Sequence, residues 1–415
     1  MIVRARNILP VCSPPVANGA VAVSGNRITA VGDWKDISRQ AADGDDVVDL
    51  GDVVLMPGLI NAHCHLDYTD MAGFWSPPKR FTDWIPQMLA AKAEWSYADY
   101  ARSWLNGAQM LLRTGTTTVA DIEAAPELLP DVWNSCPLRV HSFLEMTGVR
   151  SRREPHEIIA EALHRVETLS HPRCRTWLSP HAPYSTSPDL LRLCAQTARE
   201  KQLLVAIHVA ESEQEFDMFT HARGHMHLWL QRNGRSDADC GLGSPVRHLE
   251  RTGLLGENVL AIHANCLAPG DAEALAQHRV HVVHCPRSHD YFQHPPFPRK
   301  ALADAGVNLC LGTDSLSTVR KKGKEAPELS LFLEMPVLQA NDKTVSARTI
   351  VEMATVNGAR ALGLAGQLGQ LSPHALADLI AIPFRGKVAD IDDAVVHHAS
   401  TVSVSMIDGK WAIAP

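Results

Sequence analysis

The sequence predicts an α/β protein: a (β/α)8 TIM barrel with a small composite β-sandwich that the two ends of the chain form together. Eight short apolar runs, separated in most cases by helical patterns, predict the barrel. Near-continuous apolar strands that alternate with helices are typical of a parallel sheet covered on both faces. A hairpin pattern at each end of the chain predicts the sandwich. We expect residues 1–56 and 366–415 to form the sandwich and residues 57–365 to form the barrel.

The eight apolar runs give the expected barrel strands. Eight such units over roughly 300 residues match the usual size of this barrel. The sequence predicts a helix after the first loop, because apolar residues between Tyr97 and Leu112 fall on one helical face and Gly115 follows as a stop signal. The expected strands are Val53–His63, Thr116–Ile122, Leu138–Glu145, Arg175–Pro180, Leu203–Val209, Val259–His263, Val280–Cys285 and Val307–Gly312.

Each end of the chain carries a β-hairpin pattern. Val21–Val31 alternates around a Gly-Asn pair, and Val402–Ile413 alternates around an Asp-Gly pair. Dipeptides of this kind favour tight turns between antiparallel strands. Because a two-stranded hairpin alone is marginally stable in water, we expect the two hairpins to share one small β-sandwich.

Composition and charge restrict the class of protein. The 415 residues are 45% hydrophobic and 20% charged, which is typical of a globular protein with ample core. The net charge of −7 argues against nucleic acid as a main partner, because phosphate binding needs a basic surface. We therefore expect no nucleic-acid partner. The expected partner is a small-molecule substrate, and the sequence leaves the oligomeric state open, with a homodimer as one possibility.

Cysteine usage and the N-terminal segment indicate the compartment. The nine cysteines are odd in number, scattered, and contain no Cys-x-x-Cys, which favours reduced thiols over a disulfide framework. The N-terminus lacks a basic stretch followed by an apolar one, and no apolar run is long enough to span a bilayer. We expect a cytoplasmic protein with no membrane contact.

Two histidines at the end of the first expected strand are the strongest single signal for function. Successive side chains of a strand alternate between its faces, so His63 and His65 point the same way while Cys64 points elsewhere. Both imidazoles can therefore reach one metal ion, and imidazole suits zinc. A lone His-x-His is weak evidence in a chain with 21 histidines, so the pattern depends on what the other strand ends carry.

Polar residues that can bind a metal or move a proton follow several other strands. In a parallel barrel the carboxyl ends of the strands form the active face, so these side chains should meet there. Three histidines and one carboxylate make a suitable set of ligands for a divalent metal, which lowers the pKa of a bound water towards about 7. The residues at these strand ends are His63, His65, His181, His208 with Glu211, His263, His284 or Ser288, and Asp314.

On these motifs the chain resembles the amidohydrolase superfamily along nearly its whole length, including the composite β-sandwich. Within it, the chain looks like the mononuclear branch that deaminates aminated heterocycles. Two observations favour that branch: the expected strand Arg175–Pro180 lacks the lysine that binuclear members carry, and His208 and Glu211 form the His-x-x-Glu pattern of deaminases. The matching segments are Met56–Leu66, Thr114–Asp121, Pro180–Ser185, His208–Glu211, His263, Gly312–Asp314 and Ala377–Ala381.

The resemblance implies roles for the site residues. It implies one divalent ion, zinc or else iron, held by His63, His65, His208 and Asp314. Glu211 would carry protons to the ring nitrogen of the substrate, His263 would position the attacking water, and Asp314 would accept the proton of that water. His181 would contact the substrate.

The substrate is indicated less directly. The segment Val283–His289 departs from the pattern usual in adenosine-type deaminases and, with Phe81–Ile85, looks closer to aminofutalosine deaminases. This resemblance implies an adenine nucleoside such as 6-amino-6-deoxyfutalosine. The residues that it places near the substrate are Trp84, Ser288, and either Glu94 or Lys92 at the sugar.

An aminofutalosine-type substrate carries a carboxylate, which needs a cationic partner when it is partly desolvated. We expect Arg287 to fill this role, with the run Arg320, Lys321 and Lys322 as the alternative. Other activities remain open: deamination of S-adenosylhomocysteine or methylthioadenosine, guanine or a pterin, or s-triazine-type hydrolysis at the same metal site. A non-catalytic scaffold is disfavoured because every implied ligand is present.

Overall fold

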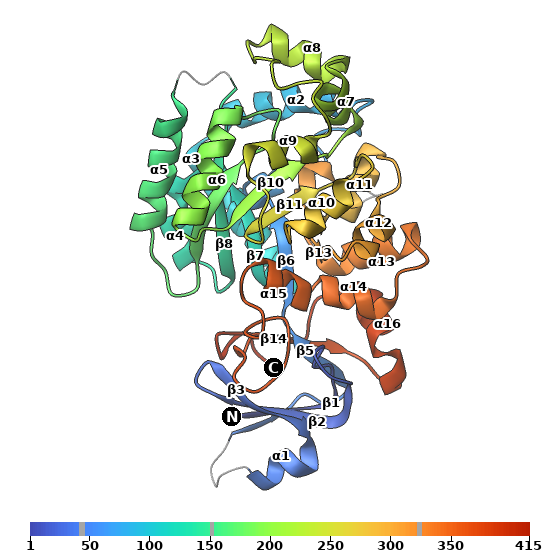
Figure 1. Cartoon of the computed structure of the whole chain (residues 1–415). Helices are drawn as coiled ribbons and strands as arrows, with labels where there is room; N and C mark the ends of the chain where they lie inside the picture. Colours follow the sequence, from blue (N-terminus) through green and yellow to red (C-terminus); the bar gives the residue numbers. More distant parts are fainter. Residues whose placement is uncertain (41–45, 150–152, 322–325) are drawn as a thin grey trace.

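The computed structural model describes residues 1–40, 46–149, 153–321 and 326–415, which form a barrel and a separate mixed sheet (Figure 1). All neighbouring barrel strands pair in parallel, in the order in which they occur in the chain. The barrel strands are β6 (Leu59–Cys64), β7 (Thr116–Glu123), β8 (Arg139–Met146), β9 (Arg175–Pro180), β10 (Val205–Val209), β11 (Val259–His263), β12 (His281–His284) and β13 (Asn308–Leu311). The predicted fold class is confirmed.

The first and last barrel strands meet at their carboxyl ends. The backbone N–H groups of Thr313 and Asp314 donate to the carbonyl oxygen of His63 at 3.0 and 3.2 Å. Cys64 and Asp314 form an isolated parallel bridge at the same place. The closure therefore brings the His63–His65 segment and Asp314 side by side, although about 250 residues separate them in the chain.

Most of the helices surround the barrel, and the first one, Trp34–Gln40, packs against β2 and β3 of the mixed sheet. The helix expected after the first loop is α3, which begins after a capping box in which Ser96 and Asp99 bond to each other's backbone N–H. The helices are α1 (Trp34–Gln40), α2 (Phe81–Glu94), α3 (Tyr97–Arg113), α4 (Leu129–Asn134), α5 (Pro155–Thr168), α6 (Pro188–Glu200), α7 (Glu213–His221), α8 (Gly224–Arg232), α9 (Pro245–Thr252), α10 (Asp271–Gln277), α11 (Pro286–Phe292), α12 (Arg299–Asp304), α13 (Leu331–Asn341), α14 (Ala347–Met353), α15 (Val356–Ala361) and α16 (Ile391–Val396). Short 3₁₀ turns lie at Leu66–Met71, Pro126–Leu128, Leu316–Thr318 and Val388–Asp390.

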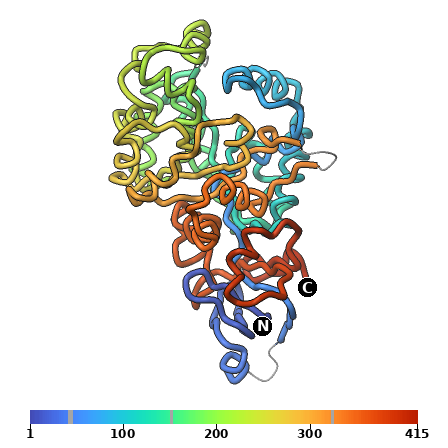
Figure 2. Tube along the Cα trace, turned by 90° about the vertical axis from the view of Figure 1, so that its right-hand side faces the viewer, coloured from blue at the N-terminus to red at the C-terminus, as the bar shows by residue number. Residues whose placement is uncertain are grey.

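The mixed sheet is built from both ends of the chain, as predicted. Its order is β16-β15-β14-β5-β1-β2-β3, with β4 paired to β1. The two expected hairpins are β2–β3 and β15–β16, and both termini lie in this part of the molecule (Figures 1 and 2). The strands are β1 (Ile2–Ile8), β2 (Val16–Ser24), β3 (Arg27–Asp33), β4 (Val47–Asp49), β5 (Val53–Pro57), β14 (Leu379–Pro383), β15 (Val404–Ile407) and β16 (Lys410–Ile413).

The expected strand Val53–His63 is two strands rather than one. Strand β5 belongs to the mixed sheet, where it pairs antiparallel with β14, and β6 belongs to the barrel. The change of sheet falls at Gly58, where a Cβ would lie 2.0 Å from Thr117 Oγ1. The apolar run is continuous across this point because both strands are buried, so hydrophobic pattern alone cannot show the change. The domain boundaries at 56 and 365 stay predictions.

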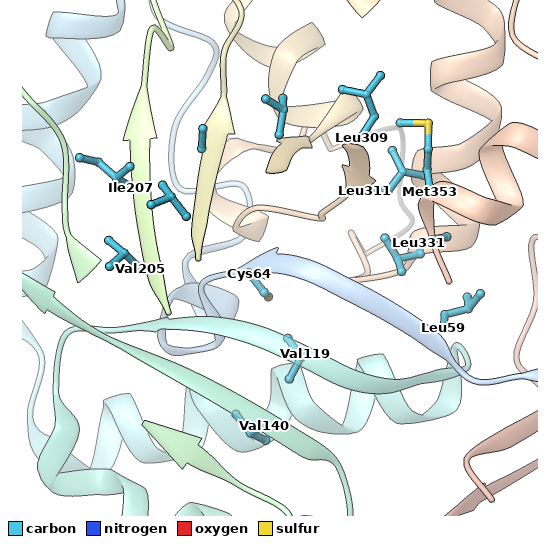
Figure 3. Packing of buried hydrophobic residues seen from close by; sticks show 14 of the residues in the cluster. Leu59, Cys64, Val119, Val140, Val205, Ile207, Leu309, Leu311, Leu331 and Met353 are labelled. Carbon is cyan, nitrogen blue, oxygen red and sulfur yellow. The ribbon is translucent and has the colours of Figure 1, made fainter. Parts of the chain in front are cut away.

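Alternate side chains of the barrel strands pack into two cores. On β10, Val205 and Ile207 point outward to the helices, whereas Ala206 joins a separate cluster with Leu260 and Ile262 of β11 inside the barrel. The outward cluster, part of which Figure 3 shows, also includes Leu309 of β13 and side chains of the surrounding helices. His208 follows Ala206 by two residues and therefore shares its inward face.

The mouth of the barrel is covered by α2, α7 and α8, at the end of the molecule opposite the mixed sheet (Figures 1 and 2). Within the described residues, no helix has both the length and the apolar character needed to cross a membrane.

Candidate active site

Four of the predicted ligands meet at the carboxyl ends of the barrel strands. The imidazoles of His63, His65 and His208 offer ligand atoms that all lie within 4.8 Å of one another, and all three residues are buried. Asp314 Oδ1 lies 3.6 Å from His63 Nε2 and 3.7 Å from His65 Nε2. These side chains come from β6 and the turn after it, β10, and the turn after β13.

The backbone at these strand ends is strained. His263 has φ 75° and Asp314 has φ 53°, and Ala210 and Ala264 are also in the left-handed region. Non-glycine residues adopt this conformation at a cost of order 1–3 kcal/mol, and such residues cluster at functional sites. His263 is the last residue of β11 and Asp314 follows the end of β13 by three residues, and both side chains line the cavity at the barrel mouth.

Neighbouring groups orient two of the predicted ligands. Ser288 Oγ donates to Asp314 Oδ2 at 2.6 Å and Thr318 Oγ1 donates to the same oxygen at 3.2 Å, which leaves Oδ1 facing the histidines. His208 Nδ1 lies 2.9 Å from the carbonyl oxygen of His181, so its Nε2 faces His65 Nε2 at 3.3 Å. Ser288 therefore contacts the expected metal ligand and is not among the residues that line the cavity described below.

The residues fit a divalent ion. Both ring nitrogens of His63 and Nδ1 of His65 are buried without a hydrogen-bond partner among the described residues, an arrangement that costs free energy unless something else satisfies them. Burial, followed by neighbouring histidines, lowers the pKa values of His65 and His208, which favours the neutral form that binds metals. Burial opposes the charge of Asp314, but the nearby imidazoles of His63, His263 and His65 hold its pKa well below the usual range.

Glu211 and His263 lie together beside this cluster. Glu211 Oε1 is 3.5 Å from His263 Nε2, and both residues are buried. Burial, and then the charge of Asp314, raises the pKa of Glu211 well above its usual range. Burial lowers the pKa of His263 to about 3. The pair can therefore offer one bound molecule a carboxyl group that keeps its proton more readily than a free one and an imidazole that is neutral at neutral pH.

A cavity of about 300 Å³ opens onto these groups. His181 lies in its wall, where its Nδ1 is 2.6 Å from Ser185 Oγ. Trp84 also lines it, and the Nε1 of Trp84 has no hydrogen-bond partner among the described residues. The lining residues include His65, Tyr68, Phe81, Trp84, Ile85, Met88, Leu89, Lys92, Glu145, His181, Tyr184, His208, Glu211, Trp229, Leu230, His263, Phe292 and Asp314.

The structure does not bring two expected substrate-binding residues to this cavity. Glu94 is exposed and Lys92 lines the cavity instead, because the inner face of α2 repeats at helical spacing through Trp84, Met88 and Lys92. The guanidinium of Arg287 is bound to the buried Glu334 on α13, with Nε 2.5 Å from Oε1.

The other expected groups are placed as follows. Arg320 and Lys321 are exposed, and Lys322 lies outside the described residues. His284 stacks on Phe297 with ring centroids 3.8 Å apart and does not line the cavity. Glu145 and Tyr68, which the strand-end pattern did not single out, do line it. Glu145 stands at the carboxyl end of its strand, so the strand-end argument that selected the histidines could have found it.

Comparison with known proteins identifies the family. The model of the amidohydrolase family matches residues 54–412, and the chain belongs to this family. The 5-methylthioadenosine/S-adenosylhomocysteine deaminase of Syntrophobacter fumaroxidans is 33% identical over 387 residues, which cover 88% of this chain and 80% of that protein. The resemblance to the deaminase branch is confirmed, and the protein is a hydrolase that acts on C–N bonds.

Two solved structures show the same fold. An adenosine deaminase from Xanthomonas campestris with bound zinc has a TM-score of 0.84 at 24% identity, covering 99% of this chain and 92% of that one. Helicobacter pylori aminofutalosine deaminase in complex with methylthio-coformycin has a TM-score of 0.88 at 20% identity, covering 99% and 100%.

Proposed function

We propose that this protein is a zinc-dependent hydrolytic deaminase of an adenine nucleoside. The proposal rests on one observation: the metal-binding cluster and the Glu211–His263 pair open onto the same cavity. Attack of water on an aminated ring carbon needs an activated nucleophile, a proton for the ring nitrogen and a proton for departing ammonia. The named adenosine-type relatives support an adenine base.

His63, His65, His208 and Asp314 would hold the ion. A divalent ion bound there supplies an activated water at neutral pH. Asp314 accepts a proton from the attacking water, and Glu211 gives its proton to the ring nitrogen as the C–O bond forms. His263 stabilises the negative charge that develops at the tetrahedral carbon by a hydrogen bond. Asp314 gives the proton that it took from the water to the amine, the C–N bond breaks and ammonia leaves. The hydroxyl group on the ring carbon gives its proton to Glu211 as it becomes the oxo group, which restores the protonated Glu211.

His181 and Trp84 would contact the base. Burial lowers the pKa of His181, which favours its neutral form. A neutral imidazole can accept a hydrogen bond from the base or donate one to a ring nitrogen of the base. Trp84 offers both an aromatic face and an unpartnered N–H from α2. The chemistry of the cluster also suits guanine, pterin and s-triazine rings, which differ in leaving group and shape while using the same nucleophile.

The test is an ammonia-release screen with the purified protein. Substrates are adenosine, 5'-deoxyadenosine, methylthioadenosine, S-adenosylhomocysteine, aminofutalosine, adenine, guanine and a pterin. We expect the adenine nucleosides to be deaminated, activity to be lost on chelation, and zinc to restore it at one ion per chain. Restoration by ferrous iron alone would replace zinc in the proposal. Ammonia released from guanine or a pterin but from no adenine nucleoside would overturn it.

A further inference from the structure

The part of the cavity beyond the metal-binding cluster is mostly apolar. Helix α2 contributes Phe81, Trp84, Ile85, Met88 and Leu89 to the wall of this part. Other elements complete the wall with Trp229, Leu230 and Phe292. Two charged side chains interrupt this apolar wall, Lys92 at the end of α2 and Glu145 near the end of β8. Among the described residues that line the cavity, Lys92 is the one Lys or Arg side chain.

Lys92 is held by one hydrogen bond, and its ammonium group keeps further N–H donors for a bound molecule. Its ammonium donates to Tyr68 Oη and lies 4.8 Å from the centre of the Tyr68 ring. An ammonium has three N–H donors, and no other hydrogen bond to Lys92 Nζ is formed within the described parts of the chain. Burial opposes the charge, but Glu145 and, to a smaller extent, Asp67 and other nearby acidic groups together outweigh burial and raise the pKa of Lys92. Lys92 is therefore a charged donor in the cavity wall.

Glu145 is the complementary acceptor. It is half-buried, and its carboxylate has no hydrogen-bond or ion-pair partner within 4.0 Å among the described residues. Burial opposes its charge, yet Lys92 and His181 lower its pKa below the usual value. An ionised carboxylate only accepts hydrogen bonds. The cavity wall thus presents an anionic acceptor, Glu145, and a cationic donor, Lys92. Their charges balance, but the two side chains are not bonded to each other.

We propose that Lys92 and Glu145 bind the hydroxyl groups of an uncharged, sugar-type substituent and discriminate against anionic substituents. This inference rests on the proposed function. A hydroxyl group both donates and accepts, so neighbouring hydroxyls can donate to Glu145 and accept from Lys92 at the same time. The apolar walls around this pair then suit an uncharged remainder of the substituent.

Among residues 1–40, 46–149, 153–321 and 326–415, no other cationic side chain lines the cavity. The guanidinium of Arg287 is held by Glu334, with side-chain exposures of 12% and 0%. Lys79 and Arg80 line a separate surface hollow, which Phe81 and Phe292 separate from the cavity with ring centroids 5.2 Å apart. A carboxylate beside Lys92 would also stand beside Glu145, and like charges in close contact are strongly unfavourable. The cavity therefore disfavours the carboxylate-bearing substrate that the motifs predict.

The charge discrimination can be tested with two substrates of the same shape. Adenosine 5'-carboxamide and adenosine 5'-carboxylate have nearly the same shape but differ in charge, because a neutral NH2 group in the first replaces a charged oxygen in the second. We expect kcat/KM for the carboxamide to exceed that for the carboxylate by about tenfold or more in the unaltered enzyme. The ratio should fall towards one in Glu145→Gln and stay unchanged in Glu94→Gln, a matched control because Glu94 is exposed. An equal or reversed preference in the unaltered enzyme overturns the inference.

The hydroxyl contact has its own test, which does not depend on charge. Removing both ribose hydroxyls, as in 2',3'-dideoxyadenosine, should raise KM by about ten- to a hundredfold in the unaltered enzyme. In Lys92→Met and in Glu145→Gln this increase in KM should be smaller, because the side chain that the hydroxyl group would bind is already altered. An undiminished penalty in both variants, with metal content and thermal unfolding as in the unaltered enzyme, overturns the inference.

These outcomes separate the inference from the function beneath it. If adenine nucleosides release ammonia but neither charge nor hydroxyl groups affect kcat/KM through Lys92 and Glu145, the inference fails alone. If no adenine nucleoside releases ammonia, both the proposed function and the inference are wrong.

Discussion

At the scale of single residues, the chemistry of the cavity depends on which atom each side chain leaves free. Ser288 and Thr318 occupy Oδ2 of Asp314, so Oδ1 is the oxygen that faces the histidines. The carbonyl oxygen of His181 occupies Nδ1 of His208 and leaves Nε2 for the same purpose. Partners of this kind fix the orientation and tautomer of metal ligands. The positions of Ser288 and Thr318 therefore matter although neither side chain would touch the ion.

Replacing Ser288 by alanine tests this positioning role. The change removes the 2.6 Å donor to Asp314 Oδ2 and keeps the proposed ligands. We expect zinc affinity, measured by competition with a chromogenic chelator, to fall by about 10- to 100-fold. Thr318→Val removes the longer 3.2 Å bond and should cost less. Unchanged affinity in Ser288→Ala would show that Asp314 is oriented by other means.

Glu211 should be dispensable for metal binding but not for turnover. The variant Glu211→Gln keeps the shape of the side chain and removes the titrating group, so kcat should fall by about 10²-fold or more while metal content is kept. Glu213→Gln is the matched control, because Glu213 is exposed two residues further on. Elemental analysis and steady-state ammonia release measure the two quantities. Full activity in Glu211→Gln would move the proton-transfer role to His263.

At this scale, strand order alone is enough to predict which strand ends lie together. The carboxyl ends of parallel barrel strands must meet at one face, so the order of the strands places His63, His208 and Asp314 together. Strand order does not determine which partner a long side chain binds. Arg287 is near the barrel mouth, but Glu334 on a helix 47 residues later in the chain binds it. No local pattern predicts such a distant partner.

At the scale of secondary structure, the elements with strong local signals agree with the prediction. Helix α3 begins at its capping box and ends before Gly115, which has φ 85°. The bounds of β7 to β13 also agree with the expected strands to within two residues. The change of sheet at Gly58 was not, because burial of β5 and β6 on both sides of it leaves no polar interruption. Only the lack of a side chain at Gly58 marks the place.

Gly58→Ala is expected to destabilise the protein. The new Cβ would lie 2.0 Å from Oγ1 and 2.6 Å from Cβ of Thr117, so the backbone of β6 or β7 must shift. Overpacking of this kind costs about 1–3 kcal/mol of unfolding free energy. Gly32→Ala is the control, since its Cβ would meet only Ile37 Cδ1 at 4.0 Å. Equal urea midpoints for the two variants would contradict the steric argument.

At the scale of the whole molecule, the mixed sheet is joined to the barrel at the end away from the active site. The chain passes from one to the other at Gly58, and a buried ion pair forms a second connection. Arg139, the first residue of β8, places Nε 3.0 Å from Asp378 Oδ2 and Nη2 3.1 Å from Oδ1. The side chains are 9% and 1% exposed. The backbone N–H of Asp408 also donates to Asp378, which ties in the C-terminal hairpin.

Breaking this ion pair should lower stability and leave catalysis intact. Arg139→Met keeps the apolar stem but leaves the Asp378 carboxylate buried without its counter-charge, which typically costs about 3–5 kcal/mol of unfolding free energy. The exposed pair of Arg192 and Asp189, 2.6 Å apart, provides the control: Arg192→Met should change stability by about 0–1 kcal/mol. Because Arg139 lies at the amino end of its strand and the catalytic groups lie at the carboxyl ends, kcat/KM at a temperature where both variants are folded should match the unaltered enzyme. A loss of kcat/KM in folded, metal-loaded Arg139→Met would mean that the sheet and the catalytic end of the barrel are coupled, contrary to this separation of roles.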